Sequence, residues 1–83
     1  MKKYTNEEVR QIVLTTVAQT LKSEPVTFLP TTPLSTYETW DSLRQLELMN
    51  NLEQAFKITL PVETIIEMTT VQTIEKLVVQ HLS

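Results

Sequence analysis

The sequence has 83 residues, of which 41% are hydrophobic and 20% charged, and its formal net charge is -3 at pH 7. It contains neither cysteine nor glycine, which excludes disulfides, thiolate metal sites and the glycine-rich loops that hold phosphates or dinucleotides. The negative charge argues against nucleic acid as a partner, and the length predicts a single small domain over residues 1–83.

No segment of the sequence has the apolar pattern of a membrane span or of a secretory signal. The longest apolar runs have three residues, such as Ile12-Val13-Leu14, whereas a helix needs about 20 to cross a bilayer. The beginning of the chain contains two lysines but no apolar core of a signal peptide. We therefore expect a cytoplasmic protein that does not have a membrane as its partner.

The apolar spacing in the first quarter of the chain predicts an α-helix over residues 6–22. Thr5 and Glu8 have the spacing of a capping box, in which each side chain accepts a hydrogen bond from the backbone of the other residue. Beyond them, one helical face is formed by residues that recur every three or four positions: Val9, Ile12, Val13, Thr16, Val17, Thr20 and Leu21.

Residues 23–40 are predicted to form a long connection between the first helix and the next. Pro25, Pro30 and Pro33 each remove a backbone donor and keep the preceding residue out of the α region. The segment also contains large apolar side chains: Phe28, Leu29, Leu34, Tyr37 and Trp40. Because a free linker would not carry so many of them, we expect the loop to lie across the helices and to bury several.

The next helix is predicted over residues 42–56, with Asp41 as its N-cap. One arc of this helix is apolar and is expected to face the core: Leu48, Met49, Leu52, Ala55 and Phe56. A second arc is mostly polar: Ser42, Leu43, Leu46, Glu47, Asn50, Glu53 and Gln54. Leu43 thus lies among polar residues, which suggests a contact with another protein. Gln45 falls within the apolar arc, and the sequence offers no reason for it.

Two further elements complete the predicted fold. A short helix is expected over residues 61–66, with Pro61 in its first turn, where the missing N–H has no cost. A last helix begins after Thr69 or Thr70, one of which is its N-cap. The prediction is an all-α, small four-helix bundle with three longer helices, one short third helix and a long first loop.

Ser42 is the residue of this sequence that is best placed to take part in a chemical reaction. It lies in the first turn of a helix, where free N–H groups and the helix dipole favour a bound anion such as a phosphate ester. Residues 38–67 around it carry six acidic and two basic residues, a net charge of -4. Such a surface suits association with basic patches on partners, although an ordinary capped helix with a solvated face has the same features.

The chain resembles the acyl carrier protein family over residues 41–72. The residues that carry the resemblance are Asp41-Ser42-Leu43, Leu46-Glu47-Leu48, Leu52-Glu53, Phe56, Leu60-Pro61 and Thr69-Thr70-Val71-Gln72. The resemblance implies a carrier protein and not an enzyme. It also implies that a phosphopantetheinyl transferase esterifies Ser42 with 4′-phosphopantetheine from coenzyme A, so that acyl intermediates are held as thioesters on a thiol that the chain itself lacks.

Roles for the residues around Ser42 follow from the same resemblance. Asp41 matches the acidic residue that helps the transferase to hold magnesium. Four residues match positions that dock on basic, partly apolar patches of an acyl-activating ligase or a synthase: Leu43, Leu46, Glu47 and Glu53. The acyl chain would enter between the second and third helices, lined by Leu46, Leu60, Ile65 and Met68. A monomer is expected.

Three departures from the family pattern refine this interpretation. Thr39-Trp40 stands where the family has a glycine two positions before the aspartate. Arg44 occupies a position that is usually acidic in fatty-acid carriers, and Asn50 one that is often apolar. Arg44 and Asn50 favour a carrier dedicated to a specialised lipid, polyketide or related biosynthetic pathway over a general carrier of fatty acid biosynthesis.

Two other functions stay open at this point. One is an aminoacyl or peptidyl carrier loaded by an adenylating ligase, although such carriers usually have a Gly-Gly-His-Ser or similar motif instead of Asp41-Ser42-Leu43. The other is an unmodified helical interaction module in which Asp41 is only a cap. A catalytic triad of Ser42, Asp41 and His81 is disfavoured, because Asp41 and Ser42 are adjacent and His81 lies near the end of the last helix.

Overall fold

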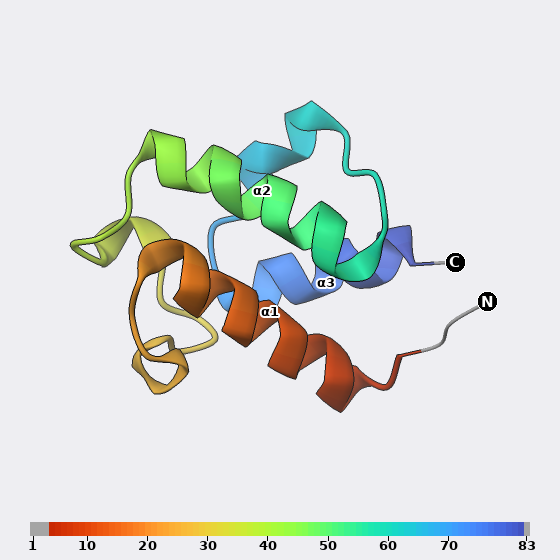
Figure 1. Cartoon of the computed structure of the whole chain (residues 1–83), viewed down its shortest axis with the longest axis horizontal. Helices are drawn as coiled ribbons and strands as arrows, with labels where there is room; N and C mark the ends of the chain where they lie inside the picture. Colours follow the sequence, from red (N-terminus) through yellow and green to blue (C-terminus); the bar gives the residue numbers. More distant parts are fainter. Residues whose placement is uncertain (1–3, 83) are drawn as a thin grey trace.

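The computed structural model describes residues 4–82, which form helices and loops and no strand (Figure 1). The α-helices are α1 (Asn6–Leu21), α2 (Ser42–Phe56) and α3 (Val71–His81), and the 3-10 helices are η1 (Pro25–Thr27), η2 (Leu34–Thr36) and η3 (Val62–Glu67). The prediction of a small all-helical bundle is confirmed. Over the same residues, the length and hydropathy of every helix fall short of a membrane span.

Local sequence signals determine where α1 and α3 begin. The Thr5 hydroxyl accepts a hydrogen bond from the Glu8 N–H (3.1 Å) and the Glu8 carboxylate accepts one from the Thr5 N–H (2.8 Å), which completes the expected capping box. Thr70, and not Thr69, caps α3 by accepting from the Thr73 N–H at 3.0 Å. Both helices therefore begin with a threonine side chain that replaces a missing backbone acceptor.

The short third helix differs in detail from its prediction. It is a 3-10 helix that begins at Val62, one residue later than expected, and Pro61 precedes it as the N-cap with extended ψ of 140°. Pro61 still stabilises the first turn of this helix, because its carbonyl accepts hydrogen bonds from the Thr64 N–H (2.9 Å) and hydroxyl (2.6 Å). η3 contacts both α2 and α3.

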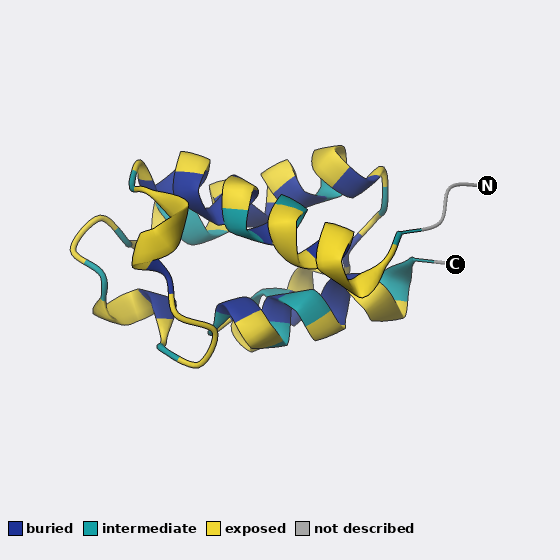
Figure 2. Cartoon of the chain, turned by 90° about the horizontal axis from the view of Figure 1, so that it is seen from below, coloured by how far each residue is buried: buried dark blue, intermediate teal, exposed yellow. Residues whose placement is uncertain are grey.

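The core lies where α1 packs against both α2 and α3, and the buried residues line the inner faces of the helices (Figure 2). Val13, Leu48, Leu52 and Ile74 are fully buried there. The expectation that Ala55 belongs to this core is wrong, since Ala55 is exposed. It lies at the edge of the apolar arc in the last turn of α2, beyond the part that the other helices cover.

The long first loop is pinned to the beginning of α3. The Leu34 N–H donates to the Thr69 carbonyl (2.8 Å), and the Pro30 carbonyl accepts from the Gln72 N–H (3.0 Å). Leu34 and Phe28 are buried, as expected of several apolar loop residues. These contacts place η2 and the residues after it beside the beginning of α2.

In a chain without glycine, α1 and α2 both end at a lysine in the left-handed conformation. Lys22 and Lys57 have φ of 55°, and the N–H of each closes the last turn of its helix. Because Lys22 leaves the right-handed region, α1 ends at Leu21 and not at residue 22 as predicted. Glycine adopts this conformation without the clash that a Cβ causes.

We therefore expect Lys57→Gly to stabilise the protein. Removing the clash outweighs the larger backbone entropy of glycine, so the free energy of unfolding should rise by about 0.5–1 kcal/mol. Urea unfolding followed by circular dichroism measures the change. Lys57→Ala removes the same charge but keeps the Cβ, so it should give little gain; an equal gain from alanine would contradict this explanation.

Candidate functional site

The site is built on the first turn of α2. The Asp41 carboxylate accepts a hydrogen bond from the Arg44 N–H (2.8 Å) and begins the helix, which makes Ser42 its first residue. Ser42 is exposed, and within residues 4–82 nothing engages its hydroxyl. The first-turn amides and the helix dipole favour negative charge at this hydroxyl.

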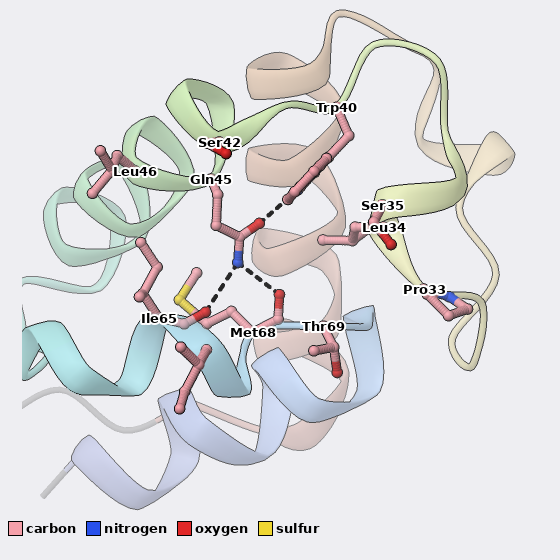
Figure 3. Close-up of a pocket in the computed structure, with 11 residues that line it drawn as sticks. Pro33, Leu34, Ser35, Trp40, Ser42, Gln45, Leu46, Ile65, Met68 and Thr69 are labelled. Atoms are coloured by element: carbon pink, nitrogen blue, oxygen red, sulfur yellow. Dashed lines mark hydrogen bonds between the residues drawn. The ribbon is translucent and has the colours of Figure 1, made fainter.

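An open groove of about 700 Å³ lies beside Ser42 (Figure 3). It is lined by Pro33, Leu34, Ser35, Trp40, Ser42, Gln45, Leu46, Ile65, Ile66, Met68 and Thr69. These residues come from the first loop, from α2 and from the η3 segment, so only the tertiary fold brings them together. The volume is within the usual range of small-molecule sites.

The Gln45 side chain spans this groove (Figure 3). Its amide oxygen accepts a hydrogen bond from the Trp40 indole N–H (2.7 Å), and its amide nitrogen donates to the carbonyls of Ile65 (3.2 Å) and Met68 (2.8 Å). Gln45 therefore ties α2 to the loop before it and to the end of η3. A buried polar group without a partner typically costs roughly 1–3 kcal/mol. Because the Gln45 amide has partners for both its oxygen and its nitrogen, it avoids this cost, and a glutamine therefore fits on the apolar arc.

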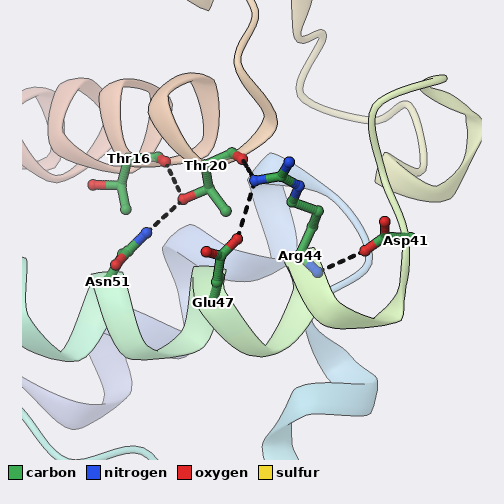
Figure 4. A network of polar contacts seen from close by, with 6 residues as sticks. All are labelled: Thr16, Thr20, Asp41, Arg44, Glu47 and Asn51. Carbon is green, nitrogen blue, oxygen red and sulfur yellow. Dashed lines mark hydrogen bonds and ion pairs between the residues drawn. The ribbon is translucent and has the colours of Figure 1, made fainter.

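A second polar cluster joins α2 to α1 (Figure 4). The Arg44 guanidinium donates to the Thr20 carbonyl (3.4 Å) and pairs with the Glu47 carboxylate (3.2 Å). The Asn51 amide donates to the Thr20 hydroxyl (2.8 Å), which in turn donates to the Thr16 carbonyl (2.7 Å). These contacts fix how α2 sits on α1, and they engage Arg44 within the chain.

The residues predicted to dock on partners have different surroundings. Leu43 is 73% exposed and Leu46 47% exposed, consistent with their positions away from the core. Glu47 is exposed but paired with Arg44. Glu53 is half-buried, and its carboxylate accepts a hydrogen bond from the Leu60 N–H (2.8 Å). One of the two acidic residues thus has a structural role that the sequence did not indicate.

The expected acyl lining is brought together except for one residue. Leu46, Ile65 and Met68 line the groove, whereas Leu60 is buried in the core and does not line it. His81 cannot join Ser42, because α2 begins at the end of the bundle opposite the last turn of α3 (Figure 1). Its imidazole instead contacts the Leu77 carbonyl at 2.9 Å.

Residues 11–78 match the model of the phosphopantetheine attachment site family. The chain belongs to this family. Its members bind 4′-phosphopantetheine covalently and are carrier domains, not catalysts, that phosphopantetheinyl transferases modify and that interact with synthase enzymes. The comparison with curated proteins gives no significant match.

The first turn of α2 fits the phosphopantetheine group. The phosphodiester would carry a negative charge, which the helix N-terminus stabilises at an exposed hydroxyl. The apolar groove next to Ser42 has room for part of the arm. When bound, the group supplies the thiol for thioester chemistry, which a cysteine-free chain lacks.

The structural role of Glu53 can be separated from a surface role by substitution. We expect Glu53→Ala to lower the free energy of unfolding by about 1–2 kcal/mol, because the N–H of the buried Leu60 loses a charged acceptor. Glu47→Ala is the matched comparison and should change it by less than about 0.5 kcal/mol, since its ion pair is exposed. Equal effects in urea unfolding would refute this distinction.

Proposed function

We propose that residues 1–83 act as one acyl carrier domain and that Ser42 carries the phosphopantetheine arm. The observation that carries the proposal is the position of Ser42: it is an exposed serine at the capped N-terminus of α2, it borders the groove, and it lies within the matched residues 11–78. Ser35 also borders the groove, but it lies in η2 and lacks an α-helix N-terminus.

The loading step uses the Ser42 hydroxyl as the nucleophile. Its oxygen forms a bond to the phosphorus that bears the pantetheine part of coenzyme A, and its proton passes to a base of the transferase. The bond from this phosphorus to the bridging oxygen breaks, and the nucleotide part of coenzyme A leaves with that oxygen and its electron pair. Asp41 would add a carboxylate to the magnesium site of the transferase. Only one of its oxygens is engaged by the helix cap, which supports this second use.

The proposed docking surface consists of Leu43, Leu46, Glu47 and Glu53 on α2. Leu43 and Leu46 follow Ser42 on α2 and are the apolar part, which a synthase or an acyl-activating ligase would bury around the arm. The acidic part suits a basic patch on such a partner. Arg44, which pairs with Glu47, reduces the negative charge closest to Ser42.

The mixture of acidic and basic side chains on α2 supports a carrier of a specialised lipid, polyketide or related pathway. Arg44 and Asn50 are the departures from the usual fatty-acid carriers, and both lie on α2. Because Arg44 is held by Thr20 and Glu47, the mixed charge is a fixed property of the surface. A partner that fits it would differ from one built for a uniformly acidic helix.

Mass spectrometry of the intact protein tests the attachment site. After incubation with coenzyme A, magnesium and a broad-specificity phosphopantetheinyl transferase, the wild-type chain should gain the mass of one phosphopantetheine group and Ser42→Ala should gain none. Ser35→Ala is the matched control and should be loaded like the wild type. Modification of a folded Ser42→Ala variant would move the site elsewhere.

The role of Asp41 in loading can be separated from its role as a cap. Asparagine is as good an N-cap as aspartate, so Asp41→Asn should leave the thermal midpoint nearly unchanged. Loss of the carboxylate should slow loading roughly tenfold or more, as for residues that support a metal site. Glu38→Gln removes an exposed charge nearby and should have little effect. Unchanged loading of Asp41→Asn would refute the role.

A further inference from the structure

Gln45 lies on α2 in a position from which its side chain can control access from Ser42 to the core. Ser42 and Gln45 are three residues apart on α2, so they share one face of the helix, and both line the groove. Figure 3 shows the Gln45 amide reaching from α2 to the η3 segment, with the Trp40 ring beside it. Its three hydrogen bonds therefore close the gap between these elements.

Several apolar side chains around this bridge are buried. Met68 and Leu34 are each 1% exposed, and Leu48 is fully buried. An alkyl chain that entered the core here would have to displace the Gln45 amide. The Trp40 indole N–H and the carbonyls of Ile65 and Met68 would then lose their partners, and methylene groups cannot replace them.

We propose that Gln45 is a polar gate that keeps the cargo in the open groove and out of the core, so that this carrier is suited to short acyl groups. The inference rests on the proposed attachment at Ser42. A short acyl group finds apolar walls in Leu46, Ile65 and Trp40 without breaking the bridge. A long chain gains little more, because it can extend only along the open groove, where one side of it stays in contact with water, unless it breaks the bridge to enter the core.

Trp40 provides a direct readout, because it is the only tryptophan in the sequence and its indole N–H is bound to Gln45. The experiment loads the chain with acetyl, hexanoyl or decanoyl phosphopantetheine from the corresponding coenzyme A thioesters. Thermal midpoints and tryptophan emission are then compared between loaded forms. Intact mass confirms the loading of each form.

In the wild-type chain, the acetyl and decanoyl forms should have the same thermal midpoint and the same emission maximum. In Gln45→Leu, which removes the three hydrogen bonds and replaces the amide with an apolar side chain of similar size, the decanoyl form should melt higher than the acetyl form, on the order of 4–8 °C. The emission of Trp40 should shift with chain length in this variant alone. Gln45→Met serves the same purpose if the leucine variant does not fold.

Gln54→Leu is the matched control, since Gln54 is an exposed glutamine on α2 that does not line the groove. It should behave like the wild type. A midpoint and emission that depend on chain length in the wild-type protein would overturn the gate, and so would independence of chain length in both Gln45 variants. Failure of the wild-type chain to be loaded at all would instead overturn the attachment at Ser42.

Discussion

The hydrogen bond from the Arg44 N–H to the Asp41 carboxylate determines where α2 begins, and the functional site depends on it. Because the helix begins there, Ser42 stands in the first turn, exposed and in the positive field of the helix. If the helix began several residues later, the hydroxyl would lie in a loop without this field. One side chain thus determines both the local structure and the place at which the chain is expected to be modified.

α2 is held from both sides by polar contacts in addition to its apolar face. On one side, Arg44 and Asn51 bind α1 through Thr20, and on the other, Gln45 binds η3. A carrier needs such a rigid platform, because its partners must find the same surface around the arm each time it moves between them. The flexible part is the prosthetic group, which raises the local concentration of its cargo at each active site.

Charge on α2 is only partly available to partners. Glu53 is bound to the loop before η3, and Glu47 is paired with Arg44, whereas Leu43 next to Ser42 is largely exposed. The local count of acidic residues therefore overstates the attraction that a basic patch would feel at the site. For the same reason, apolar contact at Leu43 and Leu46 would contribute more to recognition by a partner at the proposed docking surface.

Much of this organisation was predictable from the sequence because it depends on neighbours in the chain. The capping box at Thr5, the Asp41 cap and the spacing of apolar residues indicated the three α-helices, and the same pattern indicated Ser42. Such signals act over three or four residues, so one sequence contains them in full. The resemblance over residues 41–72 then predicted the chemistry of this serine, and the match over residues 11–78 confirmed the family.

The groove and the bridge across it were decided by the tertiary structure alone. Gln45 bonds to Trp40 on the preceding loop and to carbonyls twenty or more residues away, and Leu60 goes into the core while Leu46 stays at the surface. Helical periodicity assigns a residue to a face, but it does not say which backbone groups will lie opposite that face. That arrangement depends on how the loop, α2 and η3 pack together, and there a glutamine on an apolar arc finds the partners that the sequence could not show.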